Sequence, residues 1–402
     1  MNVLIVSQYF WPENFKINDI AKGLVEKGHN VSVLTGLPNY PTGKLFKGYS
    51  YFKIKKEKLD KITIYRSPLL TRANGSSLRL FLNYFSFAFF ASLRVLFINK
   101  KFDKIFVYEV SPITVGIPAI IAKYRFKAPI FFWVQDLWPE SIIAAGGIRN
   151  KFIINLIDKL TKFIYRHSYK ILVQSRAFIP YILNQNVNAN KIFYLPNSTE
   201  TYYNKVPVKN KFKNLMPKDG PILMFAGNIG EAQGFKTMIK SALYLNKYGI
   251  KVNWVILGDG RQRQSIENKI SKLGLQNYFF FLGSFSSKEM PWFFACADAL
   301  LVTLKKNLIF SLTIPNKIQS YMACSKPIIA SLDGEGGRVI LEAKSGFVSP
   351  SEDHISLSKS IRKFLKLNSN EKKLMGDSAR IYFEKEFERD KLINKIENIF
   401  NN

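Results

Sequence analysis

The sequence predicts an α/β protein made of two doubly wound parallel-sheet domains that face each other across a cleft. Three observations lead to this prediction: short apolar runs recur in both halves, amphipathic helical patterns separate them, and a polar stretch at 196–220 divides the chain. Strands that are apolar along their whole length are typical of parallel sheets covered by helices on both faces. Ligands of such sheets bind beyond the carboxyl ends of the strands, so we expect the functional residues there.

The first half alternates strands and helices in the order that this fold requires. Strands are expected at 3–7, 31–34, 62–66, 105–108, 130–134 and 170–174. Helices are expected at 18–27, where Gly28 ends the pattern, at about 112–123 and at about 151–168. We expect residues 1–197 to form this domain.

The second half repeats the alternation. Strands are expected at 222–226, 253–257, 278–282, 299–303, 327–331 and 346–348, and helices at 235–247, 262–273 and about 371–400. We expect residues 198–384 to form the second domain and the helix at about 385–402 to pack back on the first.

The charge of the chain narrows the classes of partner. Lys and Arg number 59 against 29 Asp and Glu, a formal net charge of +30, which favours binding to polyanions. No zinc-ligand spacing, RNA-binding signature or basic arm is present, so nucleic acid is not an expected partner. An anionic membrane surface fits better, although a lysine-rich composition on a solvated surface would give the same charge. The two cysteines lack the spacing of a metal site or a disulfide.

The longest apolar segment covers residues 80–93 and lies between Arg79 and Arg94. It is shorter than the roughly 20 residues of a membrane-spanning helix. Two interpretations remain open: a buried helix of the first domain, or a helix that lies in the membrane interface. The N-terminal residues match a first β-strand better than a signal peptide.

Glycines follow three strands of the second half. Gly227, Gly230 and Gly234 follow residues 222–226, and Gly258 and Gly283 follow or end the next two strands. Glycine lets a backbone approach an anionic group, and the helix that follows adds N–H donors. Each turn alone would also suit a loop without a ligand, but together the three indicate a nucleotide site.

The segment 314–331 and the loop 333–337 after it carry the strongest signal. Pro315 suits a helix start, which places Lys317 in the first turn. Glu335 and Gly336 lie in the loop beyond the next strand, and Arg338 follows them. Lys317 and Arg338 are expected to hold a diphosphate, where fixed positive charge stabilises a departing nucleotide. A capped helix followed by a surface loop is the alternative.

In the first half, seven residues lie just beyond predicted strand ends: Glu13, Asn14, Asn39, Tyr40, Asp136, Trp138 and Glu140. A carboxylate such as Asp136 could orient an acceptor hydroxyl or accept its proton. A helix N-cap is the alternative for Asp136, and packing in a turn is the alternative for Trp138.

These motifs resemble the family-4 glycosyltransferases of the GT-B fold, which has two Rossmann-like domains. The resemblance rests on GNIG-x3-G, LGDG, FLG and P-x-K-x3-YMA-x2-KP in the second half, and on KGHNVSVLT in the first. QYFWPEN, TGLPNYP and QDLWPES resemble a narrower subgroup that builds bacterial surface polysaccharides and includes N-acetyl-L-fucosamine transferases. The resemblance covers nearly the whole chain.

The resemblance implies transfer of a sugar from a nucleotide sugar, with retention at the anomeric carbon and without a metal or other cofactor. The donor would be UDP-linked, for example UDP-N-acetyl-L-fucosamine, and the acceptor a lipid-diphosphate-linked saccharide. The second domain would bind the donor and the first the acceptor. Such an enzyme would be cytoplasmic and peripherally associated with the inner face of the cell membrane.

The resemblance also suggests roles for individual residues. The expected catalytic residues are Asp136, Glu13 and Lys317. Donor-binding residues are expected at Gly227, Asn228, Gly230, Gly258, Gly283, Lys317, Ser320, Glu335, Gly336 and Arg338. Acceptor-binding residues are expected at Asn14, Asn39, Tyr40, Trp138 and Glu140.

Two departures from the family pattern matter. Asn228 and Gln233 stand where many members carry Arg and Lys, and the paired glutamates of an E-x7-E motif fall near Leu312 and on Ser320. A nucleotide-sugar epimerase, a NAD-linked oxidoreductase and a non-enzymatic polyanion-binding protein remain as alternatives. Neither half shows a full GxGxxG motif with a following acidic residue, which disfavours the oxidoreductase.

Overall fold

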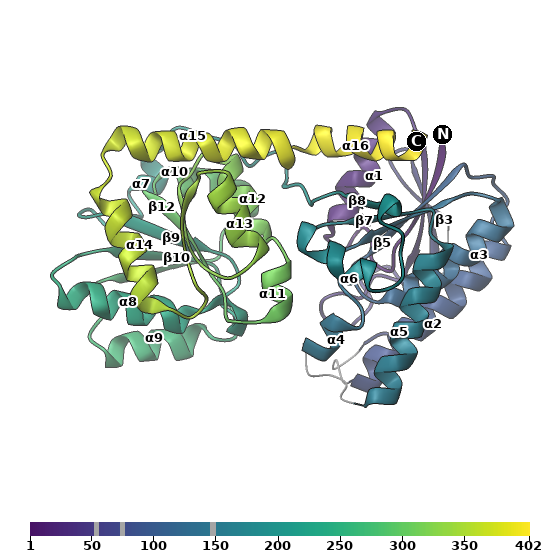
Figure 1. Cartoon of the computed structure of the whole chain (residues 1–402), viewed down its shortest axis with the longest axis horizontal. Coiled ribbons are helices and arrows are strands. Elements are labelled where there is room, and N and C mark those ends of the chain that lie inside the picture. Colours follow the sequence, from purple (N-terminus) through teal and green to yellow (C-terminus); the bar gives the residue numbers. More distant parts are fainter. Residues whose placement is uncertain (52–55, 73–76, 145–149) are drawn as a thin grey trace. The chain divides into compact units, whose positions relative to one another are not determined.

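The computed structural model of the chain describes residues 1–51, 56–72, 77–144 and 150–402. These residues form two compact units, and each unit is built around one sheet (Figure 1). Unit 1 comprises Met1–Pro196 together with Leu392–Asn402, and unit 2 comprises Asn197–Lys391. The prediction of two parallel α/β sheets is confirmed.

The sheet of unit 1 has eight strands in the order β3-β4-β2-β1-β5-β6-β7-β8. All neighbours are parallel except β3 and β4. The strands are β1 (Asn2–Val6), β2 (Asn30–Gly36), β3 (Lys56–Leu59), β4 (Ile62–Ser67), β5 (Lys104–Glu109), β6 (Ile130–Val134), β7 (Lys170–Val173) and β8 (Ile192–Tyr194). From β1 the chain adds β2 and β4 on one side of the sheet and then β5 to β8 on the other. A ligand is expected at such a switch point, beyond the carboxyl ends of β1, β5 and β6, which we call the carboxyl edge of the sheet.

Helices cover both faces of this sheet. One face is covered by α1 (Lys16–Glu26) and α16 (Arg389–Asn401), whose apolar residues pack on the buried side chains of β1, β5 and β6. The other face is covered by α2 (Ser77–Leu96), α3 (Gly116–Phe126) and α5 (Lys151–His167). Two short helices, α4 (Glu140–Ala144) and α6 (Ile179–Leu183), complete the unit.

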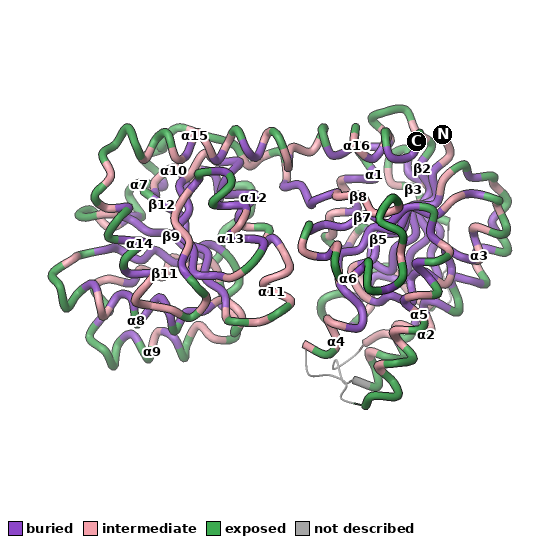
Figure 2. The backbone as a smooth tube through the Cα atoms, viewed as in Figure 1, coloured by how far each residue is buried: buried purple, intermediate pink, exposed green. Residues whose placement is uncertain are grey.

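Unit 2 contains a six-stranded parallel sheet in the order β11-β10-β9-β12-β13-β14. The strands are β9 (Ile222–Ala226), β10 (Asn253–Leu257), β11 (Phe279–Gly283), β12 (Ala299–Thr303), β13 (Ile328–Ser331) and β14 (Gly346–Ser349). The central strands of both sheets are coloured as largely buried in Figure 2, whereas the outer strands β3, β8, β11 and β14 are only partly buried. Burial on both faces therefore explains the continuous apolar sequences of the central strands.

The helices of unit 2 also form two layers. Residues of α8 (Phe235–Lys247), α9 (Arg263–Lys272) and α14 (His354–Lys366) pack on one face of the sheet. The other face is covered by α7 (Asn210–Lys213), α10 (Met290–Ala295), α12 (Asn316–Ala323), α13 (Glu335–Glu342) and α15 (Ser369–Glu386). The short α11 (Leu308–Leu312) contacts α13.

The structure differs from the sequence prediction in several elements. The strand β8 and the helix α14 were not predicted, and Glu335 and Gly336, which were expected in a loop, begin the helix α13. The edge strand β3 was not predicted, because its sequence KEKL has no apolar run. The single helix expected at about 371–400 is two helices, α15 and α16, which are separated at the fully buried Phe387. The apolar segment 80–93 belongs to a 20-residue helix, α2, so the prediction that it is too short to span a membrane is wrong.

Candidate active site

Three loops meet at the carboxyl ends of β9, β10 and β11. The amide of Gly227 donates to the carbonyl of Leu257 at 2.9 Å, and that of Gly258 donates to the carbonyl of Gly283 at 2.8 Å. Gly258 has φ +128°, and a Cβ atom there would overlap the carbonyl oxygen of Gly227. Only glycine allows these loops to approach so closely. The close approach of the loops therefore explains why residue 258 is a glycine, and its donor-binding role remains a prediction.

Lys317 extends from the first turn of α12 into this meeting point, as its predicted position in the helix requires. Its ammonium donates to Gln233 Oε1 at 2.6 Å and lies 3.9 Å from the centre of the Phe225 ring. A Cβ atom on Gly227 would be 3.4 Å from this nitrogen, so glycine leaves room for the cation beside the backbone. Within the described ranges, the ammonium forms no ion pair with a carboxylate.

Burial lowers the pKa of Lys317 to about 7. A buried ammonium that no carboxylate neutralises favours an anionic ligand, because the ligand would restore the charged state. Lys317 is therefore the residue of unit 2 that the geometry supports best as a diphosphate contact.

The two residues that replace the usual Arg and Lys are Asn228, which precedes the 3-10 turn Glu231–Gln233, and Gln233, which ends it. Gln233, at its end, holds the Lys317 ammonium through its side-chain oxygen. Asn228 precedes the turn, and its amide group lies against Gly230 and Gly260. In the sequence Gln233 stands out only as a departure from the family pattern, but in the structure it is the positioning partner of Lys317.

Arg338 is not a free cation. Its guanidinium binds both carboxylate oxygens of the buried Glu335, with N–O distances of 2.9 Å, and also contacts Glu342. These hydrogen bonds raise the pKa of Arg338. Two carboxylates of its own helix already neutralise this side chain, so the prediction that Arg338 holds the diphosphate is not retained.

Two further predicted donor residues make internal contacts. Ser320 Oγ lies 2.8 Å from Thr199 Oγ1 and bonds the carbonyl of Asn316 at the start of α12. Gly336 lets α13 pack against Ile318 and Pro315, where a Cβ atom would be 3.1 Å from each. For both residues these contacts supply a packing explanation, and their donor-binding roles remain predictions.

In unit 1, Glu13 is enclosed by backbone. Its carboxylate accepts hydrogen bonds from the amides of Asn39 at 2.9 Å, Tyr40 at 2.8 Å and Phe10 at 3.3 Å. The side chain is buried, which raises the pKa of Glu13 although the three donors favour the ionised form. Glu13 ties the loop after β1 to the loop after β2, and its predicted catalytic role is not retained.

The predicted acceptor residues differ in accessibility. Asn39 and Trp138 are buried, Glu140 begins α4 and is half-buried, and Asn14 is exposed. Tyr40 is exposed and lies beside Tyr9 and Phe15. Of these five residues, Tyr40 is best placed to touch a ligand.

Tyr40 belongs to an aromatic cluster that was not predicted from the sequence. Tyr9 stacks on Phe15 with ring centres 4.9 Å apart, and the guanidinium of Arg72 lies within 5.4 Å of the rings of Tyr9 and Tyr40. Tyr9 belongs to QYFWPEN, one of the motifs that carry the family resemblance. Arg72 follows β4 in a polar segment, and no pattern in the sequence singles it out.

Asp136 lies in a carboxylate pair that the sequence did not reveal. Its Oδ2 accepts a hydrogen bond from Ser111 Oγ at 2.7 Å. The fully buried Glu109, at the end of β5, accepts from the amides of Ser111 at 3.2 Å and Asp136 at 3.3 Å. Since α4 begins at Glu140, Asp136 is not a helix N-cap, and that alternative is wrong.

Burial raises the pKa of both carboxyls, and the charge of Asp136 further raises the pKa of Glu109 well above its ordinary value. Glu109 is out of reach of solvent, whereas Asp136 is only half-buried. Asp136 can therefore contact a ligand hydroxyl and exchange a proton with it, and Glu109 is a positioning residue beneath it.

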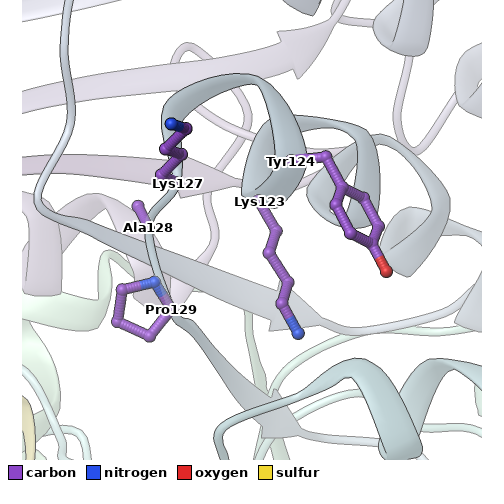
Figure 3. Close-up of a pocket in the computed structure, with 5 residues that line it drawn as sticks. All are labelled: Lys123, Tyr124, Lys127, Ala128 and Pro129. Atoms are coloured by element: carbon purple, nitrogen blue, oxygen red, sulfur yellow. The ribbon is translucent and has the colours of Figure 1, made fainter.

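A surface hollow lies at the amino ends of the strands of the same sheet, where β6 begins. It is lined by Lys123, Tyr124, Lys127, Ala128 and Pro129 (Figure 3). The ammonium of Lys123 donates to the carbonyl of His167 at 2.7 Å. Ligands of parallel sheets bind at the carboxyl edge, so this hollow is not part of the candidate site.

Comparison with known families gives two matches. Residues 15–198 match the glycosyl transferase 4-like domain, and residues 208–381 match glycosyl transferases group 1. The first match covers Tyr40, Glu109 and Asp136 but not Tyr9, and the second covers the glycine loops and Lys317.

Individual relatives agree with these matches. The chain is 28% identical over 260 residues to the probable glycosyltransferase WbjE of Pseudomonas aeruginosa, a match that covers 62% of each protein. It is 24% identical over 340 residues to the putative colanic acid biosynthesis glycosyl transferase WcaI of Escherichia coli, covering 80% of this chain and 81% of that protein. Among solved structures, Anabaena Alr3699/HepE in complex with UDP has a similar fold, with a TM-score of 0.71, 15% identity and full coverage of both chains.

Proposed function

Since this protein is a family-4 glycosyltransferase with the GT-B fold, we propose that it transfers a sugar from a UDP-sugar to a lipid-diphosphate-linked saccharide, with retention at the anomeric carbon. The product would serve the synthesis of a bacterial surface polysaccharide. The enzyme would work in the cytoplasm, on the inner face of the cell membrane.

The observation that carries the proposal is the Lys317 ammonium at the glycine loops of unit 2. It lies beside Gly227, is held by Gln233, and has a pKa lowered by burial. A diphosphate bound there would be stabilised by fixed positive charge as the sugar leaves. The UDP complex of the HepE structure supports uridine as the first nucleoside to test.

The acceptor class rests on different support. WcaI is described as a colanic acid biosynthesis enzyme, and the similarly folded WaaG is described as involved in lipopolysaccharide biosynthesis. The motifs QYFWPEN, TGLPNYP and QDLWPES add the resemblance to N-acetyl-L-fucosamine transferases. UDP-N-acetyl-L-fucosamine is therefore the first donor to test, and Asp136 is proposed to orient the acceptor hydroxyl.

Calorimetric titration of the purified protein with UDP, GDP and NAD is the first test. We expect UDP to bind and NAD not to bind. Binding of GDP in place of UDP would keep the enzyme class and change the donor. Binding of none of the three nucleotides would contradict the proposed donor site, provided that the melting curve shows a folded protein.

The pH dependence of donor binding tests Lys317 directly. Because burial holds the pKa of Lys317 at about 7 and a bound diphosphate favours the ammonium form, affinity should fall as pH rises above 7. The fall should approach about tenfold per pH unit. A UDP-sugar is the suitable probe, because its diphosphate is esterified at both ends, whereas a terminal phosphate has its own pKa of about 6.

The matched control for this pH dependence is Lys317→Arg, because arginine stays charged throughout the range. Its affinity should be independent of pH between about pH 7 and about pH 9. Equal slopes in the two proteins would show that another group is responsible.

A further inference from the structure

Two helices of unit 1 present apolar side chains to solvent. On α2 these are Leu78, Phe81, Leu82, Phe85, Phe89, Phe90, Leu93 and Leu96, and on α5 they are Phe152, Ile153, Leu156 and Phe163. Phe89 is 60% exposed and Phe152 is 77% exposed. We call these residues the α2–α5 face. Exposed apolar side chains gathered on one face of a unit in this way mark an interaction site.

The helix α2 is apolar on both sides. Phe87, Ala91 and Val95 point inward and are buried, while the α2 residues of the α2–α5 face point outward. Arg79 and Arg94 are its only charged residues, and no charge interrupts the stripe from Leu80 to Leu93. A helix on the surface of a soluble domain normally has a polar outer side, so the outer side of α2 requires a second apolar environment.

The helix cannot supply that environment by crossing a membrane. By length and composition Leu78–Leu96 would suffice, but 33% of it is buried in the unit. Asn83 is held on both sides, because it accepts from Gln8 Nε2 at 2.7 Å and donates to the carbonyl of Leu70 at 2.6 Å. Crossing would remove Phe87 and Val95 from the core. The helix can instead lie along an interface with its outer side in the lipid.

The two helices belong to one surface, because α3 packs against both of them. It contacts α2 along its length and approaches α5 so closely that a Cβ atom on Gly116 would be within 3.1 Å of three Ile164 atoms. Both α2 and α5 begin at the carboxyl edge of the sheet, after β4 and β6 respectively. The α2–α5 face therefore borders the edge that carries Asp136.

The charge beside this face identifies the partner. The three helices carry Arg79, Arg94, Lys123, Arg125, Lys151, Lys159, Lys162 and Arg166. Their single acidic residue is Asp158, which Lys162 binds at 2.8 Å. A second copy of the chain would bring like charges together, whereas an anionic lipid surface complements them.

We infer that the α2–α5 face inserts into an anionic membrane surface and so brings a lipid-linked acceptor to the edge beside Asp136. Hydrogen bonds connect the inner side of α2 to the loops after β1 and β5. Gln8 donates to Asn83, and Thr114 donates to the carbonyl of Tyr84 at 3.4 Å. An acceptor whose lipid stays in the bilayer can then reach Asp136 with its sugar. This part of the inference rests on the proposed function, but the docking itself does not.

Sedimentation with lipid vesicles tests the docking. The probe is vesicles of phosphatidylglycerol and phosphatidylethanolamine, with phosphatidylcholine vesicles as the uncharged comparison. The variant Phe81→Gln/Phe85→Gln/Phe89→Gln should lower the partition coefficient at least about tenfold, because three apolar side chains leave the lipid. Lys159→Gln/Arg166→Gln should lower it about fivefold per charge, and only on the anionic vesicles.

The matched control is Leu374→Gln/Ile381→Gln on α15, where the side chains are 58% and 67% exposed. It should bind vesicles as the unaltered protein does. All these positions are exposed, so the melting temperatures should agree, and a fall in any variant would require smaller substitutions at the same sites. No binding of the unaltered protein to anionic vesicles, or equal binding by the triple variant, would overturn the inference. If the unaltered protein is a dimer and the triple variant alone is a monomer, the face would be assigned to contact with a second copy of the chain.

Titration of the same proteins with a UDP-sugar separates the inference from the proposed function. Vesicle binding without UDP-sugar binding would overturn the proposed function and keep the docking face. UDP-sugar binding without vesicle binding would overturn the docking face and keep the proposed function.

Discussion

Replacing Lys317 by methionine is expected to lower sugar transfer by about 100- to 1,000-fold, the usual cost of removing one group that stabilises developing charge. Methionine keeps most of the side-chain volume beside Phe225 and removes only the ammonium. The charge on the departing diphosphate grows as the bond to the sugar breaks, so the turnover number should fall more than donor affinity. Transfer of labelled sugar from the UDP-sugar to a lipid extract of the source cells measures the effect.

Lys305→Met is the matched control for this substitution. Lys305 lies near the same loop, but its ammonium is exposed and binds Glu231 at 2.7 Å. It should retain transfer within a factor of about two, because exposed ion pairs contribute little. If the two lysine variants lose transfer equally, the loss comes from the local charge and not from contact with the diphosphate. Full activity of Lys317→Met would remove Lys317 from the site.

The second large effect is expected at Asp136. Asp136→Asn should lower the turnover number by about 100-fold or more, because asparagine cannot accept the proton of the acceptor hydroxyl. Its side-chain oxygen can still accept the hydrogen bond from Ser111, so the loop should keep its conformation. UDP-sugar affinity should be unchanged, since the donor contacts are assigned to unit 2.

The pH profile distinguishes this role from a structural one. Burial raises the pKa of Asp136, and a base acts only when deprotonated, so the rate should rise with pH through that pKa. This acid limb should be absent in Asp136→Asn, whose remaining activity should not depend on pH there. An unchanged acid limb in the variant would show that another group controls it, and an unchanged turnover number would exclude Asp136 as the base.

Much of the fold was predictable because burial on both faces leaves a clear trace in the sequence. Strands such as β6, with the sequence IFFWV, contain no polar residue. The edge strand β3 has one exposed side and pairs through its backbone, so KEKL carries no such trace. The break between α15 and α16 depends on the burial of Phe387, which helical periodicity does not reveal.

The site was less predictable because it depends on which groups are already occupied. Lys317 was found from its place in a helix start, but the role of Gln233 required the distance between them. The ion pairs of Arg338 could have been read from the sequence, since Glu335 and Glu342 lie three and four residues away on one helix. The enclosure of Glu13 could not, because two of its three donors, the amides of Asn39 and Tyr40, come from a loop beyond β2.

The return of α16 to unit 1 has a consequence for how the chain folds during synthesis. Leu392, Ile393, Ile396, Ile399 and Phe400 belong to the core that also contains β1 and α1. A ribosome must therefore make residues 197–391 before the core begun by the first strand can close. Unit 2 can complete its own sheet while the apolar core residues of unit 1 that α16 will cover are still exposed. We therefore expect a nascent chain that ends before α16 to bind chaperones through its first domain.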